Sequence, residues 1–194
     1  VLDPRPDSET LVDAAIKIIN SLKDVVMAEI GIGSGCLSIA IAKNCPNIQK
    51  IIASDISKQA LKVCQKNLAK HDLSNKIDLV NCSLMDKISL QHQFDVIISN
   101  PPYIRSEDIA QLQDEVKNFE PVSALDGGAD GLEFYNNICA NVNKHLKKGG
   151  YLIFEIGYNQ MRDVCDILLR YNFSIIHKIK DLGNNDRVIV AQNH

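Results

Sequence analysis

Short apolar runs rich in valine and isoleucine alternate along this chain with longer stretches that carry apolar residues at helical spacing. Runs such as Val25–Ile30, Ile48–Ser54 and Phe94–Ser99 are bounded by polar or turn-forming residues. β-branched runs of this kind indicate buried strands, and apolar residues that recur every third or fourth position indicate helices. Strands that alternate with helices predict a parallel sheet with helices packed on both faces.

The predicted elements together describe an α/β fold with a seven-stranded sheet. We expect helices near residues 8–21, 36–44, 57–70, 108–117, 132–146 and 159–171, and strands at 25–30, 48–54, 77–81, 94–99, 151–156, 173–179 and 187–191. The last two strands are joined by residues 181–186, which leave no room for a crossover helix, so this pair should be antiparallel. The sheet should therefore end in one reversed strand.

The composition is that of one ordinary globular domain covering residues 1–194. The 194 residues are 45% hydrophobic and 23% charged, with a net charge of −3, which disfavours direct nucleic-acid binding through a broad basic surface. No apolar run approaches the ~20 residues of a membrane span, and the histidines show no metal-ligand spacing. The six scattered cysteines are typical of buried thiols in a reducing compartment, so we expect a cytoplasmic protein without metal.

The tetrapeptide Asn100-Pro101-Pro102-Tyr103 directly follows the predicted strand at 94–99. Both prolines lack an N–H group and have a fixed φ, so they end the strand in a stiff turn. Ligands of open α/β sheets bind outside the carboxyl ends of the strands, where this turn would lie. A rigid amide beside an aromatic ring suits another flat amide or amino group. A strand-ending turn without chemistry is the alternative.

A second candidate site is the loop Gly31-Ile32-Gly33-Ser34-Gly35, between a predicted strand and a predicted helix. Glycine allows the backbone to approach a ligand closely. The dinucleotide-binding fingerprint has glycines at relative positions one, three and six, whereas here they fall at one, three and five, which disfavours a pyrophosphate cradle. Asp55, at the end of the next strand, can accept hydrogen bonds from both hydroxyls of a ribose, whichever nucleoside carries it. A tight turn without a ligand is again the alternative.

The glycine loop, preceded by the acidic Glu29, resembles motif I of the class I S-adenosylmethionine-dependent methyltransferases. The chain as a whole resembles the catalytic domain of release-factor glutamine methyltransferases of the HemK/PrmC type. The tetrapeptide at 100–103 is also found in adenine-N6 DNA methyltransferases, so the other stretches make the resemblance specific. Besides the glycine loop, those that carry it are residues 4–10, 99–104, 119–121, 124–128, 130–132, 154–158, 180–182 and 185–188.

The resemblance implies methylation of the side-chain amide nitrogen of the glutamine in the Gly-Gly-Gln loop of peptide chain release factors. The methyl donor would be S-adenosylmethionine, and S-adenosylhomocysteine would be the product. The implied cofactor-binding residues are Gly31, Ile32, Gly33, Ser34, Gly35, Asp55, Leu84 and Asn100. The implied substrate-binding residues are Asn100, Pro101, Pro102 and Tyr103. Among these, Asn100, Pro101 and Tyr103 have catalytic roles, and we expect a monomer that contacts no membrane.

The chemistry expected of the turn at 100–103 is the orientation of a weak nucleophile. An amide nitrogen reacts poorly because its lone pair is delocalised into the carbonyl group. The side-chain oxygen of Asn100 and the main-chain oxygen of Pro101 could each accept one hydrogen of the target NH2, which would aim the lone pair at the methyl group. The ring of Tyr103 would pack on the flat amide. Orientation of this kind can contribute about 7–11 kcal/mol.

Two departures from the family pattern are visible. The family has an acidic residue followed by a large one beside the adenine, and here this pair is Ser83-Leu84, so one hydrogen bond would be lost or supplied by the backbone. The family also has an N-terminal helical domain that helps to bind the release factor, which we expect this chain to lack.

Three other functions stay open at this stage. One is a glutamine methyltransferase acting on a ribosomal protein. Another is an exocyclic-amine methyltransferase acting on adenine or guanine in nucleic acid, which would require a basic face or a target-recognition domain. The third is a domain that binds a nucleotide without catalysis.

Overall fold

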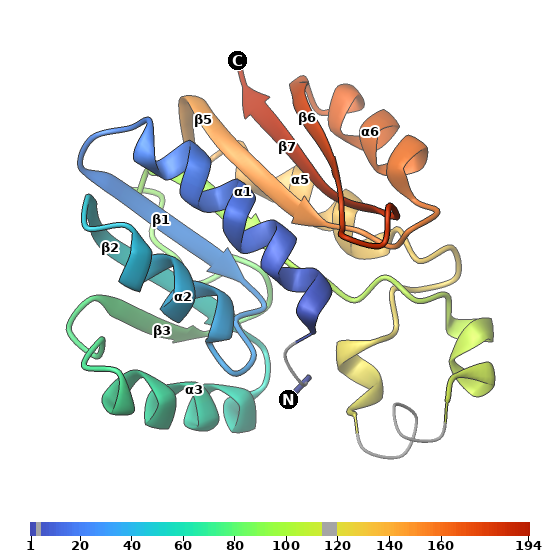
Figure 1. The fold of residues 1–194 in the computed structure, drawn as a ribbon, viewed down its shortest axis with the longest axis horizontal. Coiled ribbons are helices and arrows are strands. Elements are labelled where there is room, and N and C mark those ends of the chain that lie inside the picture. Colours follow the sequence, from blue (N-terminus) through green and yellow to red (C-terminus); the bar gives the residue numbers. More distant parts are fainter. Residues whose placement is uncertain (3–4, 114–119) are drawn as a thin grey trace.

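A seven-stranded sheet forms the centre of the protein (Figure 1). The computed structural model describes residues 1–2, 5–113 and 120–194, and within them the strand order is β3-β2-β1-β4-β5-β7-β6. Only β7 runs antiparallel to its neighbours, β5 and β6. The predicted sheet with one reversed strand is thus confirmed. The strands are β1 (Val25–Ile30), β2 (Ile48–Asp55), β3 (Ile77–Asn81), β4 (Phe94–Ser99), β5 (Leu146–Glu155), β6 (Phe173–Lys180) and β7 (Asp186–Asn193).

Helices cover both faces of the sheet, as Figure 1 shows. One face packs against α1 (Glu9–Asn20), α2 (Cys36–Asn44) and α3 (Lys58–Lys70), and the other against α5 (Glu133–Val142) and α6 (Met161–Arg170). Because successive strand residues point to opposite faces, Val96 and Ile98 of β4 join the first core and Ile97 joins the second. Short 3-10 helices lie at Pro6–Ser8, Ser106–Gln111 and Val122–Ala124. No described helix is long and apolar enough to cross a membrane.

Two predicted helices differ from the observed elements. The helix expected at 132–146 ends at Val142, because Leu146 already pairs with Phe94 and so belongs to β5. Strand pairing has overridden the helical spacing there. The helix expected at 108–117 is wrong over its described part, where a 3-10 helix at Ser106–Gln111 is followed by extended backbone at Leu112. Residues 114–119 lie outside the described residues.

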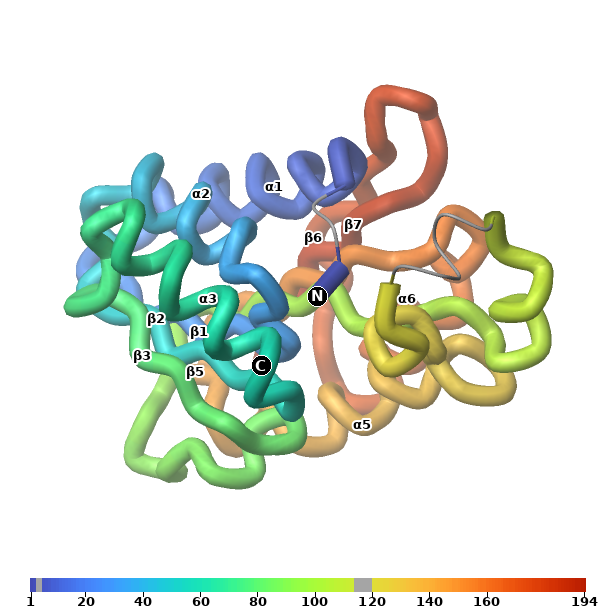
Figure 2. Tube along the Cα trace, turned by 90° about the horizontal axis from the view of Figure 1, so that it is seen from below, coloured from blue at the N-terminus to red at the C-terminus, as the bar shows by residue number. Residues whose placement is uncertain are grey.

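The carboxyl ends of the parallel strands bring distant parts of the chain together. The arrowheads of β1 and β5 in Figure 1 point toward the N-terminus and toward the green-to-yellow segment between β4 and α5. The second view, in Figure 2, also places the N-terminus between α3 on one side and that segment on the other. This edge of the sheet is where both predicted sites lie.

Candidate active site

A cavity of about 1120 Å³ opens at the carboxyl edge of the sheet. Its lining includes most of the predicted site residues, which come from four separate segments of the chain: Gly31, Ile32, Gly33, Ser34, Asp55, Leu84, Asn100, Pro101 and Pro102. Two predicted residues, Gly35 and Tyr103, are not part of the lining. The structure thus gathers the glycine loop, the end of β2, the loop after β3 and the turn after β4 around one space.

The glycine loop is held in shape by the end of β2. The main-chain nitrogens of Gly31 and Ile32 both donate to the carbonyl oxygen of Ser54, at 2.9 and 3.0 Å. Gly31 and Gly33 have φ of +77° and +56°, and a Cβ added to either would meet no atom within 4 Å. The backbone conformation therefore favours glycine, and the space in front of it can take a ligand.

Asp55 is fixed by the backbone around it. One carboxylate oxygen accepts from the nitrogen of Gly33 at 2.9 Å and the other from the nitrogen of Ser57 at 2.8 Å. Each oxygen has further lone pairs, so the carboxylate can still accept hydrogen bonds from a ligand in the cavity. Asp55 joins the glycine loop to the start of α3.

Gly35 has a packing role. Its φ is +85°, and a Cβ there would lie 2.6 Å from the sulfur of Cys64 on α3. The glycine therefore lets α2 begin close to α3. At Gly35 the loop is a tight turn with no side chain in the cavity. For this residue the structure therefore fits the alternative of a turn that contacts no ligand.

Glu29 is the buried acid of this region. It is the penultimate residue of β1, lines the cavity and accepts hydrogen bonds from the nitrogen of Ser38, at 3.2 Å, and from the hydroxyl of Ser38. Burial raises the pKa of Glu29 to about 8, although the two bonds from Ser38 oppose this rise. Glu29 therefore carries its proton at neutral pH.

Leu84, in the loop after β3, contributes to the same cavity lining as the turn at 100–103. Its φ of +47° belongs to the left-handed region, which is costly for leucine. The conformation is supported by Ser54, whose hydroxyl donates to the carbonyl oxygen of Leu84 at 2.5 Å. A half-buried leucine and the adjacent Ser83 thus form an uncharged wall.

The turn at 100–103 rests on the loop that begins at Asp126. The nitrogen of Ile104 donates to the oxygen of Leu125, and the nitrogen of Gly127 donates to the oxygen of Ile104 at 2.7 Å. A Cβ on Gly127 would lie 2.7 Å from the Cα of Tyr103, and one on Gly131 would lie 2.5 Å from its oxygen. Only glycine allows this loop to pack so closely behind the turn.

The four residues of the turn have different surroundings. Asn100, Pro101 and Pro102 line the cavity, whereas the ring of Tyr103 packs on the hydrophobic core formed with α5 and α6. Burial raises the pKa of the Tyr103 hydroxyl. In this structure, then, Tyr103 supports the turn from behind.

The amide of Asn100 lies beside residues that the sequence did not single out as site residues. Its nitrogen lies 3.4 Å from the hydroxyl of Ser8, which precedes α1. The carboxylate of Glu155, at the end of β5, takes hydrogen bonds from both Ser8 and Asn100 that lower its pKa against the larger effect of burial, which raises it. In the sequence, Glu155 could have been identified as an acidic residue at the carboxyl end of a buried strand.

An ion pair forms part of the cavity lining. Arg5 and Glu120 both line it, and a guanidinium nitrogen of Arg5 lies 2.5 Å from Oε1 of Glu120. The side chain of Glu120 is only 7% exposed, and its Oε2 has no hydrogen-bond partner in the described part of the chain. The pair connects the N-terminal segment to the loop before Val122–Ala124.

The chain matches known methyltransferases over its whole length. A family model described as "Methyltransferase small domain" matches residues 8–118. The release factor glutamine methyltransferase of Fusobacterium nucleatum is 40% identical over 99% of this chain, and that of Clostridium botulinum is 39% identical over all of it. The chain spans 54% and 69% of the length of these two relatives.

The fold is also that of solved methyltransferases. A crystal structure of ribosomal protein L11 methylase from Lactobacillus delbrueckii subsp. bulgaricus superposes with a TM-score of 0.71 at 21% identity, over 99% of this chain and 81% of that one. This likeness confirms the predicted Rossmann-like methyltransferase fold. The sequence matches go further, and on their strength the chain belongs to the release factor glutamine methyltransferase family.

Proposed function

We propose that this domain transfers a methyl group to the side-chain amide nitrogen of the glutamine in the Gly-Gly-Gln loop of a peptide chain release factor. The observation that carries the proposal is that Asn100 and Pro101 line the same cavity as the glycine loop and Asp55. Acceptors for the N–H groups of a substrate amide thus lie next to a space large enough for a nucleoside. Membership of the family supplies the substrate class.

The cavity suits S-adenosylmethionine as the methyl donor. The open space in front of Gly31 and Gly33 leaves room for a ligand against the backbone, and Asp55 offers acceptors for ribose hydroxyls. Leu84 gives an apolar wall for the adenine. The cofactor would supply an electrophilic methyl group. The volume of about 1120 Å³ also leaves space beside the cofactor for a substrate side chain.

Asn100 and Pro101 would act by orienting the substrate amide. The side-chain oxygen of Asn100 and the main-chain oxygen of Pro101 each accept one N–H of the target, which fixes the nitrogen and turns its lone pair toward the cofactor. A site that bonds both N–H groups also rejects a glutamate side chain, because its own acceptors would face carboxylate oxygens. Tyr103 stiffens the turn that carries both acceptors.

The test is methyl transfer from labelled S-adenosylmethionine by the full-length protein to purified release factors. We expect label in the wild-type factor and none in a factor whose loop glutamine is replaced by alanine. Asn100→Ala should reduce transfer below about 1% while the affinity for S-adenosylmethionine stays within about threefold, since the cofactor contacts lie mainly on the glycine loop and Asp55. Near-normal turnover by Asn100→Ala would contradict the proposal.

The same assay separates the alternatives. A ribosomal protein and total tRNA and DNA are offered in parallel with the release factors. Label in a ribosomal-protein glutamine, or in a nucleic-acid base, in place of the release factor would identify the other substrate classes. Binding of the cofactor without transfer to any of them would favour a noncatalytic domain.

A further inference from the structure

Glu155 is a buried acid beside the turn at 100–103. It is the last residue of β5, and its neighbour Phe154 pairs in register with Ser99, so Glu155 lies alongside Asn100. Glu155 is only 2% exposed. Its Oε2 has no hydrogen-bond partner within the described residues. Ser8 and Asn100 are near enough to the carboxylate to lower its pKa. Glu155 is therefore a buried acid with a free acceptor oxygen, and it lies next to Asn100, whose amide is proposed to bind the substrate.

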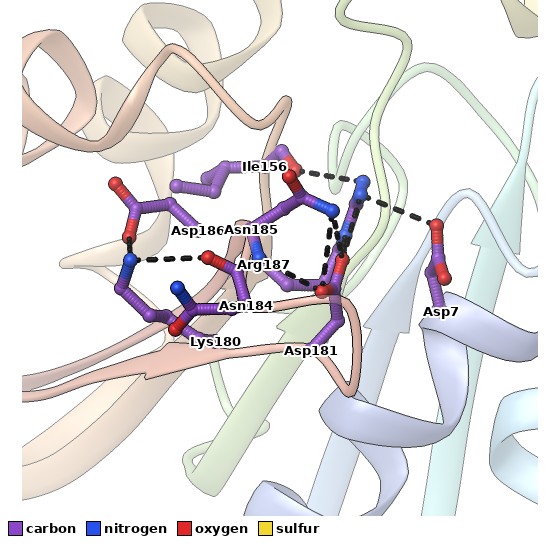
Figure 3. Close-up of polar contacts among 8 residues, drawn as sticks. All are labelled: Asp7, Ile156, Lys180, Asp181, Asn184, Asn185, Asp186 and Arg187. Atoms are coloured by element: carbon purple, nitrogen blue, oxygen red, sulfur yellow. Dashed lines mark hydrogen bonds and ion pairs between the residues drawn. The ribbon is translucent and has the colours of Figure 1, made fainter.

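A buried cation lies on the other side of Glu155. Arg187 is the second residue of β7, beside Val188, which pairs with Glu155. Its guanidinium nitrogens donate to Asp181 at 3.1 and 3.2 Å and to the oxygen of Ile156 at 3.4 Å. Figure 3 shows it held between Asp181 of the hairpin and Asp7 of the N-terminal segment, whose carboxylate lies 3.2 Å away.

The charges around Glu155 have opposing effects on its ionisation. Burial raises the pKa of Glu155, and the negative charge of Asp7 adds to that rise. The hydrogen bond from Ser8, the positive charge of Arg187 and the hydrogen bond from Asn100 all lower it. Burial lowers the pKa of Arg187, but the hydrogen bond to Asp181 and the nearby acids raise it overall, so Arg187 stays protonated. The pKa of Glu155 is raised overall by burial, and the positive charge of Arg187 opposes this rise.

A carboxylate only accepts hydrogen bonds, whereas an amide has one end that donates and one that accepts. When Glu155 is ionised, the NH2 of Asn100 is the end of the amide that can bond to it, and in the structure this NH2 lies 3.4 Å from the Ser8 hydroxyl. Its oxygen is then left for the cavity. If the amide were reversed, two N–H donors would face the substrate NH2, and no hydrogen bond could form between them.

We propose that Glu155 is a positioning residue that orients the Asn100 amide with its oxygen toward the substrate. The proposal rests on the proposed function, because it assumes that the substrate is an NH2 group bound at Asn100. Neither Asn100 nor Glu155 takes up the proton that the amide nitrogen loses when it is methylated, and this proton passes to solvent. Glu155 acts solely through the direction of the Asn100 side chain.

The test replaces Glu155 by glutamine, which has the same shape and can offer either an oxygen or an NH2 to Asn100. We expect kcat to fall about 10- to 100-fold, the effect of losing a hydrogen bond to a charged group, with KM for the release factor and Kd for S-adenosylmethionine within about threefold. Asp13→Asn, on the exposed side of α1, is the matched control and should leave all three values unchanged.

A second readout separates orientation from a structural effect. A release factor with glutamate in place of the loop glutamine should be a weak competitive inhibitor of the wild-type enzyme, because two acceptors would face each other. In Glu155→Gln a reversed Asn100 presents its NH2, so the inhibition constant of the glutamate factor should improve about tenfold relative to the glutamine factor. Loss of packing alone would weaken both factors together.

The outcomes are distinct. If the wild type is active and Glu155→Gln has the same kcat and the same discrimination against the glutamate factor, the inference is overturned and the proposed function stands. A wild type that methylates no release factor overturns both. If Glu155→Gln does not fold, Ser8→Ala replaces it, because the Ser8 hydroxyl makes no capping bond to α1. That variant should lose about three- to tenfold in kcat at constant KM, and an unchanged kcat overturns the inference.

Discussion

The side-chain nitrogen of Gln160 lies 3.0 Å from the main-chain oxygen of Tyr103. The same nitrogen donates to the oxygen of Gly131 at 3.1 Å, and the side-chain oxygen accepts from the nitrogen of Gly157 at 2.9 Å. One buried amide therefore joins the turn after β4, the loop before α5 and the segment after β5. These three segments surround the residues that carry the proposed chemistry.

Replacing Gln160 by alanine should destabilise the protein by about 2–4 kcal/mol, because buried carbonyl and N–H groups would lose their partners. The free energy of unfolding from urea titration measures this. Gln93→Ala is the matched control: Gln93 also donates to main-chain oxygens, but at an exposed position, so a loss below about 1 kcal/mol is expected. Equal losses for the two variants would contradict the role assigned to Gln160.

Gly127→Ala should impair transfer more than cofactor binding. A Cβ at Gly127 would lie 2.7 Å from the Cα of Tyr103 and 2.9 Å from the oxygen of Pro102, both of which are backbone atoms. The turn must shift, and misplacement by about 1 Å can cost about 100-fold in rate. Steady-state kinetics and calorimetric titration with S-adenosylmethionine measure the two effects. A drop in cofactor affinity as large as the drop in kcat would argue against a local shift of the turn.

Asp55→Ala should weaken cofactor binding. Its carboxylate holds the nitrogens of Gly33 and Ser57 and is the proposed acceptor for the ribose hydroxyls. Hydrogen bonds to a charged group contribute about 1.5–3 kcal/mol each, so Kd for S-adenosylmethionine should rise at least about tenfold. Asp78→Ala is the control, since Asp78 forms an exposed ion pair with Lys50 on the neighbouring strand. An unchanged Kd in Asp55→Ala would remove Asp55 from the cofactor site.

Glu29 should make stability depend on pH. Burial raises its pKa from 4.5 to about 8, so between these values the folded state holds a proton that the unfolded state releases. The stability that the neutral form contributes is therefore complete below about pH 4.5. It falls by about 1.4 kcal/mol per pH unit as the pH rises, and it is lost as the pH passes through about 8. Glu29→Gln removes this titration but keeps an acceptor for Ser38.

The measurement compares the free energies of unfolding of the wild type and Glu29→Gln at several pH values from about 5 to about 8.5. The other titrating groups are shared, so the difference between the two proteins reports Glu29. We expect the free energy of unfolding of the variant to increase relative to that of the wild type as the pH rises. A difference that does not change with pH would mean that Glu29 is ionised throughout.

Local sequence signals were sufficient for the sheet and for the cofactor side of the cavity. β1, β3 and β4 begin and end at the predicted residues, because buried β-branched runs with clear boundaries can form little else. The loop Gly31–Gly35 and Asp55 follow such strands directly, so the parallel sheet alone places them at one edge. The end of the helix at Val142 was missed because the pairing of Leu146 with Phe94 is not local.

The proposed orientation of the Asn100 amide depends on tertiary structure. Asn100 is visible in the sequence as the first residue of a stiff turn, but nothing near it in the chain indicates which end of its amide faces the cavity. Ser8, Glu155 and Arg187 come from three distant segments and meet only when β5 and β7 pair and α1 packs across them. A sequence motif determines which residue is available, whereas the donors and acceptors that surround it in the fold determine its direction.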